Sequence, residues 1–185
     1  MNYHKIEKTS IANGTGIRVV LWVSGCSLHC KGCHNPETWS LNSGKLFDEN
    51  AKKELFEALD KPYIQGITFS GGHPLECENL DVVNELCLEI KKKYPIKDIW
   101  LYTGYNFDDF LPLFQVMPRQ TYLYDNNFIL LGRIANIISM CDVVVDGQYI
   151  EEFRDITLKW KGSSNQRVID VKKTLKENKI VLYNN

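Results

Sequence analysis

Residues 26–33 read Cys26-Ser27-Leu28-His29-Cys30-Lys31-Gly32-Cys33, a C-x3-C-x2-C pattern with no fourth cysteine nearby. Three thiolates can hold three corners of a cubic 4Fe-4S cluster and leave one iron without a protein ligand. An open metal position separates catalytic metal sites from closed structural ones. On spacing alone, the pattern also fits a structural zinc site in which His29 or His34 completes three cysteines.

Several motifs on either side of the cysteines narrow these alternatives. Upstream, an apolar run leads to Ser24-Gly25 and is preceded by Asn13-Gly14-Thr15-Gly16-Ile17-Arg18. Downstream follow, in order, His34-Asn35-Pro36-Glu37-Thr38-Trp39, Ser70-Gly71-Gly72-His73-Pro74, Tyr102-Thr103-Gly104-Tyr105, Val145-Asp146-Gly147-Gln148 and Trp160-Lys161-Gly162-Ser163-Ser164-Asn165-Gln166. Together they resemble the radical S-adenosylmethionine superfamily, and within it the activases of anaerobic ribonucleoside-triphosphate reductases. The resemblance covers nearly the whole chain except residues 115–138.

This resemblance implies an activity. In such proteins an electron from the reduced cluster cleaves S-adenosylmethionine to methionine and a 5′-deoxyadenosyl radical, and the cofactors carry the difficult chemistry. The radical removes hydrogen from a glycine of the anaerobic ribonucleoside-triphosphate reductase catalytic subunit, after a one-electron donor such as flavodoxin has reduced the cluster. Two alternatives remain open from the sequence: an activase of another glycyl radical enzyme, of the formate lyase type, and a non-catalytic zinc-binding interaction module.

The resemblance also implies site residues. It makes Cys26, Cys30 and Cys33 the cluster ligands, and it places S-adenosylmethionine against Gly32, Cys33, His34, Gly71, Gly72, Thr103 and Asp146. Many superfamily members carry an aromatic residue where Gly32 stands, and here the ring of His34 would take its place. Asp146 has an alternative role as a turn residue before Gly147, and His34 has one as a surface imidazole.

His73 departs from the family pattern. An acidic residue usually follows the Gly-Gly pair, and an imidazole cannot replace a carboxylate that faces an ammonium group. We therefore expect either that backbone carbonyls bind the amino group of the cofactor or that its affinity falls. Arg18 could pair with a carboxylate, although a surface ion pair is the usual arrangement.

Strand-like and helix-like segments alternate along the chain, which predicts an α/β fold with a parallel sheet. We expect strands at 19–23, 66–70, 99–102, 143–145 and 180–183. We expect helices at 48–59, from 80 to about 94, and at 166–176. The length of 185 residues predicts a single domain over 1–185. A closed eight-fold barrel takes about 250 residues, so this chain can supply only a partial barrel. The resemblance implies that this domain is a partial, open β/α barrel of the radical S-adenosylmethionine type.

Bulk composition excludes several classes of protein. The net charge is −1 with 44% hydrophobic and 24% charged residues, so no overall field attracts nucleic acid or an anionic membrane. The first residues lack the apolar region of a signal peptide, which predicts a cytoplasmic protein with reduced cysteines. We expect the three scattered cysteines, Cys77, Cys87 and Cys141, to be small buried apolar residues.

Overall fold

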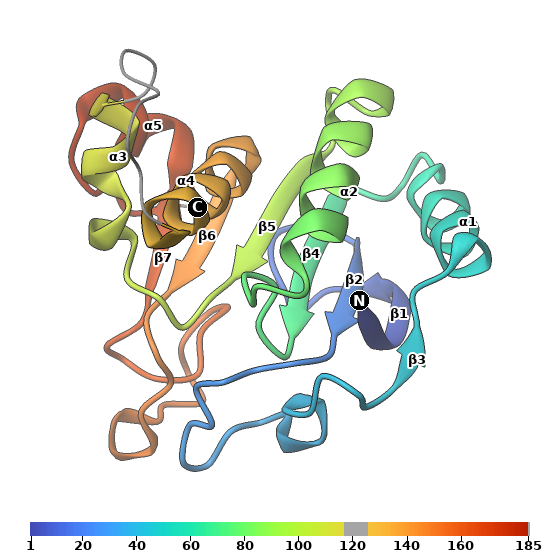
Figure 1. Ribbon diagram of the computed structural model, residues 1–185, viewed down its shortest axis with the longest axis horizontal. Coiled ribbons are helices and arrows are strands. Elements are labelled where there is room, and N and C mark those ends of the chain that lie inside the picture. The colour runs from blue at the N-terminus through green and yellow to red at the C-terminus, as the bar shows by residue number, and fades with distance from the viewer. Residues whose placement is uncertain (117–125, 185) are drawn as a thin grey trace.

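The computed structural model describes residues 1–116 and 126–184 (Figure 1). The strands are β1 (Asn2–Ser10), β2 (Arg18–Val23), β3 (Lys45–Leu46), β4 (Gly66–Gly71), β5 (Asp98–Tyr102), β6 (Val143–Asp146) and β7 (Arg167–Asp170). The α-helices are α1 (Glu49–Leu59), α2 (Leu80–Lys93), α3 (Leu111–Val116), α4 (Asn126–Met140) and α5 (Val171–Glu177), and the 3-10 turns are η1 (Pro36–Thr38), η2 (Phe107–Asp109) and η3 (Glu151–Phe153). The sequence motifs leave residues 115–138 unexplained. Of these, 115–116 lie at the end of α3 and 126–138 lie in α4, whereas 117–125 lie outside the described residues.

The described strands form one open seven-stranded sheet in the order β3-β1-β2-β4-β5-β6-β7. Strands β2, β4, β5 and β6 pair in parallel, as the alternating pattern predicts. The outer strands β1, β3 and β7 join antiparallel. In Figure 1 the arrowheads of the parallel strands point to one edge of the sheet, where the loops after β2 and β6 gather.

The predicted elements of the parallel core are confirmed to within a few residues, and the end of the chain needs a correction. The helix predicted at 166–176 is wrong over its first part, because 167–170 forms β7 against β6. Helix α5 begins only after Asp170, whose carboxylate accepts a hydrogen bond from the Lys173 amide. The strand predicted at 180–183 reduces to a single bridge between Ile169 and Leu182.

Helices cover one face of the sheet and bury the main core. Alternate strand residues such as Leu21, Phe69 and Leu101 pack there against Leu55 of α1 and Leu86 of α2. Cys87 and Cys141 belong to this core, as predicted, whereas Cys77 is exposed in the loop before α2. Within 1–116 and 126–184, no helix combines the length and apolarity that crossing a membrane requires.

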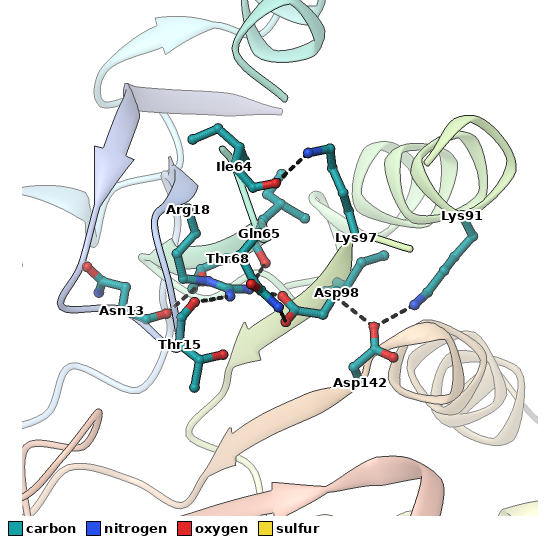
Figure 2. Close-up of polar contacts among 12 residues, drawn as sticks. Asn13, Thr15, Arg18, Ile64, Gln65, Thr68, Lys91, Lys97, Asp98 and Asp142 are labelled. Carbon is teal, nitrogen blue, oxygen red and sulfur yellow. Dashed lines mark hydrogen bonds and ion pairs between the residues drawn. The ribbon is translucent and has the colours of Figure 1, made fainter. Parts of the chain in front are cut away.

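The other face of the sheet holds a smaller cluster around Trp100 and the buried side chain of Arg18. Figure 2 shows the Arg18 guanidinium surrounded by polar groups: it donates to Thr68 Oγ1 at 2.8 Å and lies 2.6 Å from Asp98 Oδ1. It also donates to the Thr15 carbonyl at 2.9 Å. Arg18 is therefore a buried residue that anchors the β1–β2 loop, and not part of a surface ion pair.

Candidate functional site

A pocket of about 250 Å³ opens at the edge where the parallel strands end. Its wall combines the cysteine loop, the turn after β4, the loop after β5 and the segment after β6. Most of the candidate residues line it, namely Cys26, Cys30, Cys33, His34, Gly71, Gly72 and Thr103. The structure thus brings together motifs that extend from Cys26 to Gln166 in the chain, as expected where parallel strands end at a common edge.

The cysteine loop leaves β2 and is fixed at its start by backbone hydrogen bonds. The amides of Gly25 and Cys26 donate to the carbonyls of Thr38 and Trp39, at 2.7 and 2.9 Å. The loop turns again where the Cys33 amide donates to the Cys30 carbonyl at 3.1 Å. The three loop cysteines are unpaired thiols of intermediate burial on one wall of the pocket.

These thiols suit a soft metal. Burial raises the pKa of the Cys26 thiol, so metal binding must supply the energy to remove its proton. Among the described residues, no three His, Cys, Asp or Glu side chains are arranged as ligands of a single metal ion. A cubic cluster makes a different demand, because each thiolate binds a separate iron and the ligands surround a volume. Three thiolates facing one pocket fit that demand.

Gly32 lies beside the pocket rather than in its lining. Its backbone has a φ of +72°, and a Cβ there would lie 2.1 Å from Glu151 Oε2. The close contact at Gly32 is therefore with the loop that follows β6. The Glu151 carboxylate also accepts a hydrogen bond from the Tyr149 hydroxyl of the same loop, which helps to hold the carboxylate beside Gly32.

His34 lines the pocket and packs against Tyr149, with the ring centroids 4.9 Å apart and the ring planes tilted by 52°. A Cβ on Gly162 would come within 3.0 Å of the His34 ring. The imidazole thus contacts two residues of the segment after β6 while remaining exposed, so it is a surface group at the rim of the pocket. His29, the other histidine of the loop, packs against Trp39 with the ring centroids 4.8 Å apart and the planes tilted by 50°.

The Gly-Gly turn at the end of β4 packs directly on the start of the cysteine loop. The Gly72 amide donates to the Val23 carbonyl at 2.8 Å, and the His73 amide donates to the Gly25 carbonyl at 2.6 Å. A Cβ on Gly72 would lie 2.5 Å from the Gly25 carbonyl oxygen. Glycine is therefore required at Gly72 by the contact between two backbone segments, before any ligand is considered.

His73 and Thr103 form a buried hydrogen bond between neighbouring loops. The imidazole Nε2 lies 2.7 Å from Thr103 Oγ1, and both side chains line the pocket. The Thr103 hydroxyl also accepts from the Tyr105 amide at 3.1 Å. His73 is 1% exposed, so the residue that departs from the family pattern is built into the pocket wall.

The structure places Asp146 away from the pocket lining. Its carboxylate is fully buried, lies 2.5 Å from Arg167 Nη2 and accepts from the Phe107 amide at 2.8 Å. Its neighbour Gly147 lines the pocket instead. The carboxylate thus fastens β7 and η2 to the end of β6.

The segment Trp160–Gln166 contributes more to the site than its sequence indicates. Gly162 and Gln166 line the pocket. Gln166 Oε1 accepts from the Gly162 and Ser163 amides at 2.9 and 3.2 Å, while its Nε2 donates to the Gly147 carbonyl at 2.9 Å. In the sequence, the only indication that this segment belongs to the site is that its motif is the last in the ordered series of motifs. Its small and amide residues carry no distinctive chemistry.

Comparisons with known proteins agree with this geometry. A family model described as a 4Fe-4S single cluster domain matches residues 12–169, which include the cysteine loop and the Gly-Gly turn. The anaerobic ribonucleoside-triphosphate reductase-activating protein of Enterobacteria phage T4 is 39% identical over 168 residues, covering 91% of this chain and 93% of its own. The chain belongs to the anaerobic ribonucleoside-triphosphate reductase-activating protein family.

Other members of the activating-protein family match over a similar span. The protein of that name from Escherichia coli K12 is 35% identical over 91% of this chain and 97% of its own length. The protein of that name from Vibrio cholerae is 38% identical over 90% of this chain and 96% of its own length. Together with the cluster-domain match, this membership favours iron and sulfur over zinc at the cysteine loop.

Proposed function

We propose that this protein activates an anaerobic ribonucleoside-triphosphate reductase by generating a glycyl radical in the reductase catalytic subunit. One observation carries the proposal: three cysteines with open-cluster spacing and a Gly-Gly turn line the same pocket at the edge where the parallel strands end. Family membership supports the partner, because the relatives are named as activators of that reductase.

Cys26, Cys30 and Cys33 would hold the 4Fe-4S cluster. When bound, a reduced cluster with one open iron supplies the electron that cleaves S-adenosylmethionine to methionine and a 5′-deoxyadenosyl radical. The protein contributes orientation and the exclusion of side reactions. Tyr149 and Gln166 of the segment after β6 complete the lining of this pocket.

The remaining residues would orient the cofactor. Gly71 and Gly72 offer backbone groups to its amino end, and Thr103 and the ring of His34 border the same space. Gly32 keeps the loop in the conformation that carries Cys33. We assign Asp146 an indirect role, in which it orients the pocket residue Gly147 through the ion pair with Arg167.

The proposal extends to the whole chain. The open sheet with a parallel centre and helices on one face is compatible with a partial β/α barrel of the radical S-adenosylmethionine type. We propose one such domain over residues 1–185, acting in the cytoplasm and reduced by a one-electron donor such as flavodoxin. The net charge of −1 supports partners other than nucleic acid or an anionic membrane.

Metal analysis and cofactor cleavage test the chemistry. Anaerobically purified protein is expected to carry about four irons per chain and, once reduced, to convert S-adenosylmethionine to 5′-deoxyadenosine and methionine. Alanine at Cys26, Cys30 or Cys33 should abolish the cleavage. Cys77→Ala is the matched control, because Cys77 is exposed and outside the loop, and it should leave cleavage unchanged. Stoichiometric zinc without iron uptake would contradict the proposal and favour a zinc-binding interaction module.

A further inference from the structure

Glu76 joins the turn after β4 to the cysteine loop. Its Oε1 accepts hydrogen bonds from both the backbone amide and the hydroxyl of Ser27, each at 2.6 Å. Ser27 directly follows Cys26 and lies 49 positions away from Glu76 in the chain. Glu76 belongs to none of the sequence motifs described above, and it is not among the residues that line the pocket.

The same carboxylate reaches the buried His73. Glu76 Oε1 lies 3.6 Å from His73 Nδ1, and the other ring nitrogen bonds Thr103. Ser27, Glu76, His73 and Thr103 therefore lie in series across three loops of the pocket wall. Hydrogen bonds join the first two and the last two, and the 3.6 Å contact between Glu76 and His73, which is too long for a hydrogen bond, lies between them. Contacts with His73 and with Ser27 lower the pKa of Glu76 to about 2, so the carboxylate accepts these bonds in its charged form, which makes them stronger.

The contact between Glu76 and Ser27 lies directly after the first cysteine of the loop. Up to Cys26 the loop is held by backbone bonds and by Asn79, whose amide donates to the Ser24 carbonyl at 2.9 Å. Beyond Cys26 the loop contacts other parts of the chain, as in the ion pair between Lys31, whose side chain is 82% exposed, and Glu152 at 3.3 Å. Glu76 is therefore the side chain that binds the loop directly next to Cys26.

We infer that Glu76 is a positioning residue that fastens the cysteine loop to the Gly-Gly turn, with His73 as the buried link to Thr103. The inference rests on the proposed function, since it assigns the two joined segments to the cluster and to S-adenosylmethionine. In this chain the carboxylate three residues after the Gly-Gly-His sequence would thus fix the distance between the two cofactor sites, and backbone groups of the turn would be left to contact the cofactor.

Limited proteolysis of the cluster-free protein tests the fastening without any activity. Glu76→Ala removes both bonds to Ser27 and is expected to speed tryptic cleavage after Lys31 about tenfold, because charge-assisted bonds of this kind contribute at least that factor. Glu76→Gln keeps an acceptor oxygen and should restore slow cleavage to within about threefold. Ser27→Ala removes one bond from the other side and should have a smaller effect in the same direction. Glu78→Ala, at an exposed acid two residues away, is the control.

The reconstituted protein tests the consequence for the cofactors. Glu76→Ala should release iron to a ferrous chelator about tenfold faster than wild type and need more S-adenosylmethionine to change the EPR spectrum of the reduced cluster, with Glu76→Gln again close to wild type. If Glu76→Ala behaves like Glu78→Ala in both the cleavage and the iron release, the inference is wrong. If the wild type takes up no iron, the proposed function fails, whereas the cleavage rates still decide whether Glu76 fastens the loop.

Discussion

Thr103 supplies hydrogen bonds to two loops of the pocket wall at once. Its hydroxyl is shared between the His73 ring and the Tyr105 amide, and its side chain is buried. A buried polar group that loses its partner retains the full cost of desolvation. The stability of this wall therefore depends on one hydroxyl.

Thr103→Val is expected to lower the free energy of unfolding by about 1–3 kcal/mol, because it leaves both partners of the hydroxyl unsatisfied in the same volume. Thr103→Ser keeps the hydroxyl and should cost less. Urea denaturation of the cluster-free protein measures both variants. Equal stability of the valine and serine variants would show that the hydroxyl is not the stabilising group.

Gly72 tests whether the Gly-Gly turn is required by the fold itself. Gly72→Ala places a Cβ against the backbone of Gly25, which cannot rotate away, and is expected to cost about 1–3 kcal/mol. Gly104→Ala is a matched control from the same pocket, because its Cβ would meet the end of the Leu28 side chain, which can move. Urea denaturation should show the larger loss for Gly72→Ala. The reverse order would mean that the turn has room for a side chain.

Single residues also show what the sequence can and cannot predict about the site. The cysteines, the glycine pair, His34 and Thr103 were predicted from motifs, and the structure gathers them at one pocket. Asp146 was expected at the cofactor, but its partner Arg167 lies 21 positions along the chain and approaches only once β7 pairs with β6. The Ser27–Glu76 contact likewise depends on tertiary packing that no local pattern encodes.

At the level of elements, local patterns predicted the buried parallel strands and the first two helices. A continuous apolar and β-branched run such as Val19–Val23 favours a buried strand, and β2 forms there. Asp48 caps α1 as expected, since its carboxylate accepts a hydrogen bond from the Ala51 amide at 2.9 Å. The edges of the sheet were harder to predict. Residues 167–170 form a strand because β6 offers a free side, which is a property of the sheet and not of that segment.

Asp142 connects elements on the helical face. Its carboxylate lies 2.5 Å from Lys91 of α2 and 2.5 Å from Lys172 of α5, and it accepts from the Ile99 amide of β5. Figure 2 shows Lys91 reaching across to it. Burial raises the pKa of Asp142, but the bonds to Lys172 and Lys91 outweigh burial and lower it below the ordinary value of 3.8.

This carboxylate gives a pH dependence of known sign. Because its pKa is lower in the folded state, its contribution to stability is complete above pH 3.8 and is lost as the pH falls through the lowered folded value. Asp142→Asn should cost about 2 kcal/mol at pH 7, and its difference from wild type should shrink below pH 3.8. Thermal unfolding against pH measures this, with the exposed Asp109→Asn as control. A difference that grows at low pH would contradict the assignment.

Arg18 and Asp98 form a second connection, on the opposite face of the sheet (Figure 2). Arg18 is fully buried, so Asp98→Asn leaves a charge without its carboxylate and is expected to cost about 3 kcal/mol. Arg18→Met combined with Asp98→Asn should cost less than the sum of the single changes, since the double variant leaves no unpaired charge. Urea denaturation of the wild type, the two single variants and the double variant gives the coupling free energy from this double-mutant cycle. Strict additivity would show that the pair is not coupled.

At the scale of the whole molecule, the main hydrophobic core and the pocket lie at different parts of the sheet. Helices cover one face, while the edge at which the parallel strands end carries the pocket and the long loops (Figure 1). A sheet that stays open leaves this edge accessible to a large partner, which would deliver a glycine loop and help exclude water. We propose that this pocket generates a radical for one particular partner, the anaerobic ribonucleotide reductase.

EPR spectroscopy can detect the glycyl radical in the partner. Reduced protein with its cluster and S-adenosylmethionine, mixed anaerobically with its cognate anaerobic ribonucleotide reductase, is expected to produce a glycyl radical signal in the reductase. The same mixture with a formate lyase should produce none, and Cys30→Ala should abolish the signal with the reductase. A strong signal in the lyase and none in the reductase would contradict the assignment of the partner, and no signal in either would contradict the radical chemistry.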